Sequence, residues 1–182
     1  MQQTVKHTDL WINRDEPGLR RSLLIHRSAE ELFDLWRAPS TLPRIMEHFA
    51  RITILSNTAS HWAVRMPLGK TVEWDAHIVD EERGHYISWA SEKKATVPNA
   101  GRLTFRHISD ERGTEVTLAL HLHFDPPGGF LGEWLSKKID LVPEAMLSQA
   151  LRRFKSLAET GEIATNKPQP AARHGGMDKV EE

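Results

Sequence analysis

The sequence predicts an α+β fold in which a curved antiparallel sheet of about seven strands surrounds a long C-terminal helix. Apolar and polar residues alternate over much of the region 49–124, which is typical of strands with one buried face. Short polar turns with glycine separate these segments, and such turns join antiparallel neighbours. After residue 129 the apolar period becomes helical and remains so to about residue 159.

The chain has 182 residues, enough for one domain with its own core. We expect a loosely ordered leader (1–19), a folded domain (20–162) and a disordered tail (163–182), because only the middle part carries periodic apolar residues. Six Trp accompany a single Tyr. Aromatic surface is therefore concentrated in large apolar side chains, which suit a core or the wall of a lipophilic pocket.

Charge and cysteine content exclude several classes of function. A formal net charge of -1 gives no basic field for phosphate groups, so no nucleic-acid partner is expected. No apolar run approaches the roughly 18 residues that a membrane-spanning helix needs, and the N-terminal residues lack the apolar centre of a signal peptide. We therefore expect a cytoplasmic protein without a transmembrane segment. The absence of cysteine excludes disulfides, thiolate nucleophiles and cysteine-based metal sites.

The folded domain is expected to begin with a strand and two short helices. Residues 20–26 form the strand, and Ser28 stands three positions before Glu31, the capping-box spacing that begins a helix over 29–36. A second short helix is expected through 44–46, because the proline before it is tolerated in a first helical turn.

Five segments with a period of two then follow, each with one apolar face. Polar turns that contain Gly84 and Gly113 join some of them, and glycine there is expected to supply a positive φ. The apolar residues of the five segments are Trp62, Val64 and Met66; Val72, Trp74, Ala76 and Ile78; Ile87 and Trp89; Leu103 and Phe105; and Val116, Leu118, Leu120, Leu122 and Phe124.

Pro143 interrupts the helical pattern near the C-terminus. Because proline kinks a helix interior, we expect a shorter helix over 131–139 and a main helix over 143–159, which Gly161 ends in a left-handed conformation. The sheet has more apolar inner surface than two short helices can cover, so the main helix must cross it. If the helical segment bends away at Pro143, a pocket opens between the sheet and the helix.

Several local phrases, together with the order of elements, carry a family resemblance. The phrases are SAEELFDLW at 28–36, VEWDA at 72–76, ISW at 87–89, AGRLTF at 100–105 and LRRFKSLAETGE at 151–162. The chain resembles the START-like SRPBCC superfamily, which includes polyketide cyclase/dehydrase and coenzyme Q-binding proteins. The resemblance implies a helix-grip fold with a deep cavity between the sheet and the C-terminal helix, which relatives use for lipids, quinones, polyketides or hormones, or as a catalytic chamber.

The leading expectation from this resemblance is noncatalytic binding of a small hydrophobic ligand, such as a lipid, a quinone or a polyketide-like compound. The candidate pocket-lining residues are Trp62, Met66, Trp74, Trp89, Phe105, Leu118, Leu120, Leu122 and Met146. Close-packed interiors use the same residue types, so about half of the strand residues are expected to fill the core instead. Trp74 and Trp89 lie in the middle of their strands and are expected to face the pocket.

Two alternatives stay open: a cyclase- or dehydratase-type lyase that uses the same cavity, and a protein-interaction module similar to chaperone-ATPase activators. Convergent titratable groups with shifted pKa in the cavity would favour the enzyme. An exposed apolar patch over a filled core would favour the interaction module. The sequence contains no Gly-x-Ser-x-Gly or His-Glu-x-x-His motif, and it identifies no catalytic residue.

The histidines do not predict a metal site. His121 and His123 lie two apart on one strand, but their phase is opposite to that of the apolar residues, so they are expected on the solvated outer face. His77 shares this outward phase with Glu73 and Asp75. The sequence therefore predicts no metal and no other cofactor.

Overall fold

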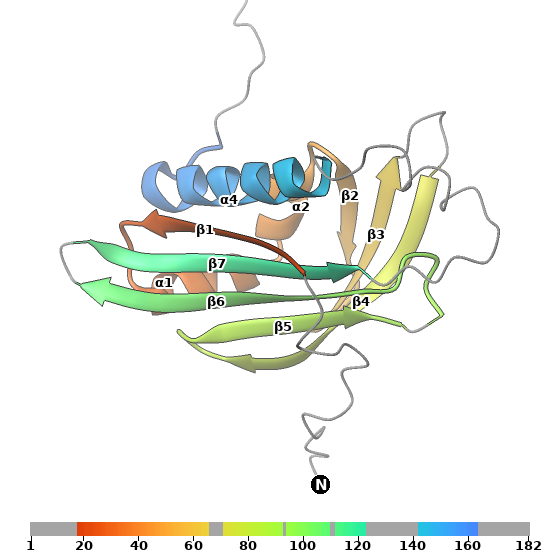
Figure 1. Cartoon of the computed structure of the whole chain (residues 1–182), viewed down its shortest axis with the longest axis horizontal. Helices are drawn as coiled ribbons and strands as arrows, with labels where there is room; N and C mark the ends of the chain where they lie inside the picture. Colours follow the sequence, from red (N-terminus) through yellow and green to blue (C-terminus); the bar gives the residue numbers. More distant parts are fainter. Residues whose placement is uncertain (1–17, 66–70, 93, 110–111, 123–141, 164–182) are drawn as a thin grey trace, which may run out of the picture.

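The fold is a seven-stranded antiparallel sheet that curls around helix α4 (Val142–Thr160), which confirms the predicted α+β helix-grip architecture (Figure 1). Most of the leader predicted over 1–19, the helix predicted over 131–139 and most of the predicted tail lie outside the described residues, and Leu19 already belongs to the first strand. The computed structural model describes residues 18–65, 71–92, 94–109, 112–122 and 142–163.

The strand order in the sheet is β1-β7-β6-β5-β4-β3-β2. Strands that follow one another from β2 to β7 pair antiparallel, and β1 pairs with β7. The other elements are β1 (Leu19–Ile25), α1 (Ala29–Arg37), α2 (Thr41–Met46), β2 (Ala50–Ile54), β3 (Ala59–Arg65), β4 (Thr71–Glu82), β5 (Tyr86–Ser91), β6 (Asn99–Ser109) and β7 (Gly113–Leu122).

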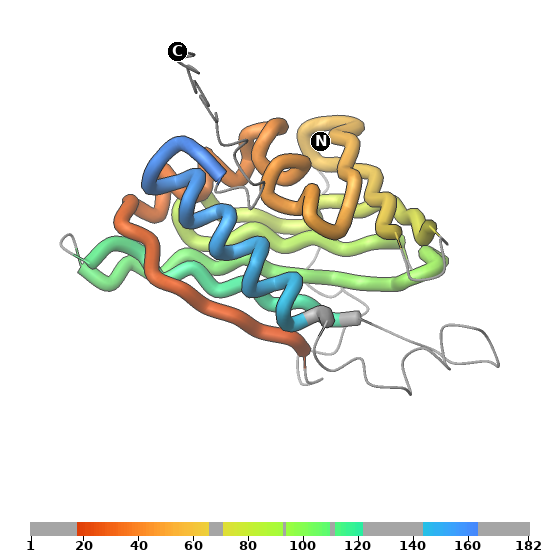
Figure 2. The backbone as a smooth tube through the Cα atoms, turned by 90° about the horizontal axis from the view of Figure 1, so that it is seen from above, coloured from red at the N-terminus to blue at the C-terminus, as the bar shows by residue number. Residues whose placement is uncertain are grey.

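The three helices lie on the same side of the sheet. Figure 2 shows α4 crossing the sheet between β1 and the two short helices. The concave face is therefore shared between α4 at one end and the pair α1 and α2 at the other.

No described helix is long and apolar enough to cross a membrane.

Helix α1 begins with the predicted capping box. The backbone N–H of Glu31 donates to Ser28 Oγ at 3.3 Å, and the backbone N–H of Ser28 donates to Glu31 Oε2 at 3.0 Å. The helix ends at Arg37 because Ala38, with ψ 129°, is extended, as expected of a residue that precedes proline. Pro39 thus stops α1 after nine residues.

Helix α2 is longer than the sequence predicts. It begins at Thr41, whose hydroxyl donates to the Leu35 carbonyl oxygen at 2.6 Å, and it includes Pro43 in its first turn. The buried side chain of Thr41 therefore fixes the turn between the two short helices.

Helix α4 is fastened to the edge strand β1 by polar contacts. Arg21 and Glu144 form an ion pair near the beginning of α4. Farther along the helix, Lys155 Nζ donates to the Leu24 carbonyl oxygen at 2.8 Å. Gly161 follows the helix with a φ of 76°, and its N–H donates to the Leu157 carbonyl oxygen at 2.9 Å, which confirms the predicted helix end.

The glycines of the two predicted turns, Gly84 and Gly113, have φ values of 78° and 84°, which confirms the predicted positive φ. At Gly113 a side chain would also collide with the Ile25 carbonyl oxygen. Glycine is required there for space as well as for conformation.

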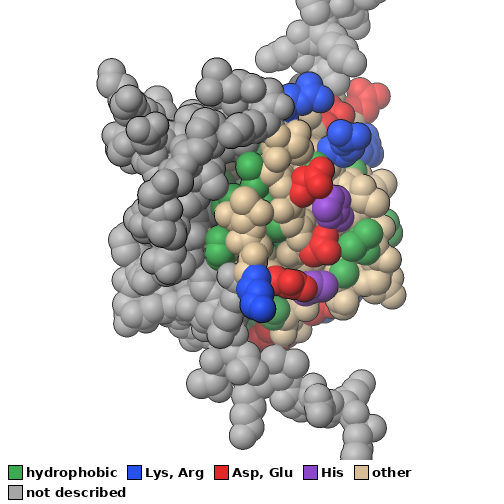
Figure 3. Space-filling model, turned by 90° about the vertical axis from the view of Figure 1, so that its right-hand side faces the viewer, with side chains coloured by type: hydrophobic (Ala, Val, Ile, Leu, Met, Phe, Trp, Pro, Cys, Tyr) green, Lys and Arg blue, Asp and Glu red, His purple; other side chains and the backbone are tan. Residues whose placement is uncertain are grey.

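The outer face of β3 and β4 is polar. His61 Nδ1 lies 2.7 Å from Asp75 Oδ1, and His77 is exposed on the same strand as Asp75, although it also belongs to the residues that line the cavity described below. Figure 3 shows acidic, basic and histidine side chains interspersed on this side of the molecule. The described residues contain no group of three or more His, Cys, Asp or Glu that could hold a metal ion.

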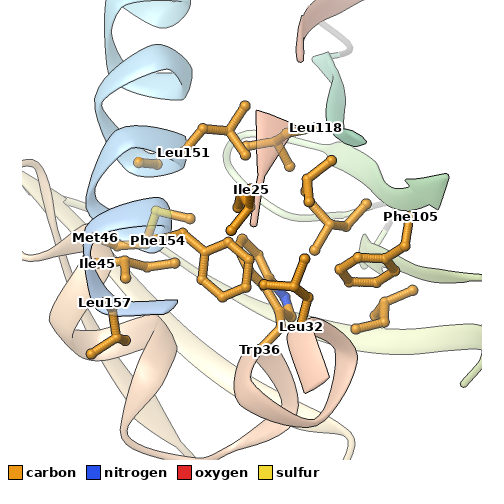
Figure 4. Close-up of a cluster of buried hydrophobic side chains, with 14 of the residues drawn as sticks. Ile25, Leu32, Trp36, Ile45, Met46, Phe105, Leu118, Leu151, Phe154 and Leu157 are labelled. Carbon is orange, nitrogen blue, oxygen red and sulfur yellow. The ribbon is translucent and has the colours of Figure 1, made fainter. Parts of the chain in front are cut away.

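The core fills the space between α4, the short helices and strands β1, β6 and β7 (Figure 4). Phe154 of α4 is fully buried, and its ring meets that of Trp36 edge to face with centroids 5.0 Å apart. Ile25, Leu32 and Leu151 are also almost completely buried in this cluster. The space between α4 and the sheet is therefore occupied by side chains.

Candidate functional site

A cavity of about 180 Å³ lies between the two short helices and the sheet. Its wall is formed by the end of α1, the turn to α2, helix α2, the β2–β3 turn, and strands β2 to β5. The described lining residues comprise an apolar group, Trp36, Ala38, Pro39, Leu42, Met46, Ile54, Ala59, Trp62, Ala76, Ile78, Ile87 and Trp89, and a polar group, Arg37, Ser56, Asn57, Thr58, Ser60 and His77.

Neighbouring residues fix the indole rings of the wall. Trp36, only 4% exposed, is held against Phe154. The ring of Trp89 occupies the space that a side chain at its cross-strand partner Gly101 would need. Neighbouring side chains and the sheet therefore hold both rings in place, and such preorganised walls lower the entropic cost of binding in general.

Trp62 forms the third aromatic part of the wall. Its ring stacks on Trp74, with centroids 6.0 Å apart and planes 10° from parallel. Its Nε1 donates to Ser60 Oγ at 3.0 Å. Because the one donor of this indole already has a partner, Trp62 offers the cavity mainly apolar surface.

Arg37 is the one Lys, Arg, Asp or Glu side chain among the described lining residues. Its Nε lies 2.8 Å from Glu81 Oε2, and the two side chains are 25% and 32% exposed. Glu81 does not line the cavity. The ion pair joins the end of α1 to β4 and leaves Arg37 as a cation in a wall that contains no other Lys, Arg, Asp or Glu among its described residues.

The described cavity does not involve the C-terminal helix. The pocket expected between the sheet and that helix would include residues before 142, which lie outside the described residues, and no described residue of α4 lines the cavity. The reason is that α4 packs closely on the sheet through Leu147, Leu151 and Phe154, all nearly fully buried. The early end of α1 and the small side chains of Ala59 and Ala76 leave room at the other end.

The structure separates the predicted lining residues into several groups. Trp62 and Trp89 line the cavity, whereas Trp74 lies against the ring of Trp62 and is not among the lining residues. Phe105 belongs to the core and packs on Phe33, with ring centroids 6.1 Å apart. Two of these four predicted residues, Trp62 and Trp89, are therefore among the described lining residues.

The remaining predicted lining residues do not belong to the described cavity wall. Leu118 is buried in the core, and Leu120 is half-buried against it. Met146 is half-buried on α4 and is not among the cavity-lining residues. Met66 and the side chain of Leu122 lie outside the described residues.

Sequence reasoning missed the helical part of the wall. Trp36 of α1 and Leu42 and Met46 of α2 line the cavity, but none of them is among the lining residues predicted from the sequence. A signal was present, because Pro39 ends α1 directly after Trp36 and Arg37 and so leaves a large aromatic side chain at the end of a short helix.

The described groups with a shifted pKa lie away from the cavity wall; they are Glu31, Asp34, His48, Arg83, Tyr86 and Glu159. A hydrogen bond to Asp80 raises the pKa of Tyr86, and burial lowers the pKa of His48. None of these groups is placed for acid–base chemistry on a molecule in the cavity.

The chain matches the model of a protein family. The family is described as polyketide cyclase / dehydrase and lipid transport, and its model matches residues 25–152, well over half of the chain. This range contains all the described lining residues of the cavity. A search of curated proteins found no match.

Solved structures share the fold. A crystal structure of a Deinococcus radiodurans protein is 32% identical, covers 80% of this chain and 99% of its own, and has a TM-score of 0.60. A protein from Thermus thermophilus has a TM-score of 0.62 at 19% identity, with 78% of this chain and 97% of that chain covered. The second likeness concerns the fold alone.

Proposed function

Because the chain belongs to the SRPBCC-type polyketide cyclase / dehydrase and lipid transport family, we propose that it binds a small hydrophobic molecule between α1, α2 and the sheet. The observation that carries the proposal is the cavity of about 180 Å³ with its mainly apolar wall. Water gains few hydrogen bonds in such a space, so an apolar molecule replaces it favourably.

The volume limits the size of the ligand. An apolar cavity of about 150 Å³ accepts benzene, whereas drug-sized sites have about 300–1,000 Å³. The cavity of about 180 Å³ therefore suits a molecule, or the part of a molecule, with one or two rings. The ring of a quinone would fit, but a longer lipid or polyketide would extend beyond the described wall.

The expected affinity is low. Burying an aromatic ring of about 150–250 Å² at about 25 cal/mol per Å² contributes roughly 4–6 kcal/mol, from which the costs of association are subtracted. We therefore expect dissociation constants in the millimolar range or weaker for simple one-ring compounds. Additional polar contacts would be needed for tighter binding.

The test is a titration with toluene, followed by NMR, of the native protein and two matched variants. Ala76→Leu adds methyl groups inside the cavity, whereas Ala63→Leu changes β3 on the opposite face, where Ala63 pairs with Glu73. Toluene should bind the native protein and Ala63→Leu alike and should bind Ala76→Leu at least about tenfold more weakly. Equal binding to both variants would place the ligand elsewhere.

The alternatives have less support among the described residues. Acid–base groups with shifted pKa, which would favour a lyase, are not found among the described lining residues. Leu55, 56% exposed, is the single exposed large hydrophobic side chain of the described part, so an apolar docking patch is not seen there. The noncatalytic role and a cytoplasmic location remain predictions.

A further inference from the structure

The wall of the cavity changes from apolar to polar between its deep part and its mouth. The deep residues Trp36, Met46 and Ile87 are nearly fully buried. The polar lining residues Asn57 and Thr58 belong to the exposed β2–β3 turn. A molecule that matches this wall has an apolar body inside and a polar group toward the solvent.

Arg37 determines the charge that this polar group should have. Its guanidinium carries a positive charge, and Glu81 is its charged partner among the described residues, through Nε. A guanidinium has five N–H donors in a planar fork, so its terminal amino groups can hold a further acceptor. A carboxylate suits that fork best because it accepts two parallel hydrogen bonds.

We infer that the cavity binds a one-ring aromatic carboxylate, with the ring against Trp36, Trp62 and Trp89 and the carboxylate on Arg37. This inference rests on the proposed function. Indole faces and edges favour an aromatic ring over an aliphatic body of equal volume. The volume of about 180 Å³ accommodates one ring together with a short acidic substituent.

Glu81 gives the inference a second, independent consequence. A bound carboxylate would share Arg37 with the Glu81 carboxylate, and the two negative charges would repel each other. Removing the charge of Glu81 should therefore strengthen binding of an aromatic acid, although the same change removes the present partner of Arg37. If Arg37 only stabilised the fold, removing the charge of Glu81 would not strengthen the binding of an aromatic acid.

The experiment compares benzoate with toluene at pH 7 and constant ionic strength, by NMR titration of the full chain. In Arg37→Gln, the dissociation constant of benzoate should rise about tenfold or more, because a charge-assisted pair is lost. Toluene is titrated into the same variant, and the ratio of the benzoate to the toluene dissociation constant should rise about tenfold, which separates loss of the charge from a change in the cavity itself. In Glu81→Gln, benzoate should bind about two- to fivefold more tightly.

The outcomes separate the inference from the proposed function. Native protein that binds toluene but not benzoate, or Arg37→Gln that binds benzoate as the native protein does, would overturn the inference and leave the proposed function in place. Weaker benzoate binding in Glu81→Gln would also overturn it. If the native protein binds neither toluene nor benzoate, both the inference and the proposed function are contradicted.

Discussion

The two ends of the concave face differ in how they are filled. At the α4 end, Leu151 and Phe154 reach the sheet and leave no described cavity lining on that helix. At the other end, α1 stops before Pro39, and the small side chains of Ala59 and Ala76 face the space that remains. The length of a covering helix and a few small side chains therefore decide where this sheet leaves a cavity.

The largest expected effect is a loss of stability, which should differ between one leucine from each end of the concave face. Leu151 is 1% exposed in the core, so Leu151→Ala should leave a cavity and cost about 2–5 kcal/mol of unfolding free energy. Leu42 is half-buried and already faces the open space, so Leu42→Ala should cost less than about half as much. Urea unfolding of both variants gives the comparison. Equal losses would mean that the α2 end is as closely packed as the core.

A smaller effect is expected where the sheet supports the cavity wall. Gly101→Ala would force the ring of Trp89 away from its cross-strand partner, at a cost of about 1–3 kcal/mol. The same change should weaken toluene binding, because Trp89 lines the cavity. Thr104→Ala, at an exposed position of the same strand, is the control and should stay within about 0.5 kcal/mol of the native protein. A neutral Gly101→Ala would contradict the described position of the Trp89 ring.

The smallest expected effect is a pH dependence of stability that comes from His48, at the boundary where α2 meets α4. Burial, and then the positive charge of Arg153, lower the pKa of His48, whose Nδ1 lies 3.0 Å from the Ile45 carbonyl oxygen. The unfolded chain therefore takes up a proton at a higher pH than the folded chain. This contribution to stability is complete above the unfolded pKa of about 6.5 and is lost as the pH falls below it.

The expected loss between pH 7.5 and about pH 5.5 is below roughly 1 kcal/mol, because His48 is only partly buried. Urea unfolding at several pH values measures it. His48→Gln should flatten this part of the pH profile, and His85→Gln, at an exposed turn, serves as the control. A profile that His48→Gln leaves unchanged would show that His48 is not responsible.

The sequence predicted the fold well because local signals agree with the tertiary structure. The strand alternation, the capping box at Ser28 and the glycine turns each identify an element without knowledge of its partners. Alternation also identified the face on which a side chain lies. These signals are local, so one sequence was enough to read them.

The cavity wall could be predicted only in part, because alternation does not reveal what lies opposite a side chain. Trp62 and Trp74 share the same phase and pair across two strands, yet only Trp62 is among the lining residues. Phe105 has the same inward phase but meets Phe33 of α1. Whether an inward residue faces a helix or a space depends on long-range packing.

The most direct test of the central claim asks which end of the concave face holds an apolar molecule. Toluene is titrated into ¹⁵N-labelled protein, and the changes in amide and indole N–H chemical shifts are mapped on the fold. The largest changes should occur at Trp36, Ala76 and Trp89, which surround the cavity, with little change at Leu147 and Leu151 of α4. Changes centred on α4, or none at saturating toluene, would contradict the account.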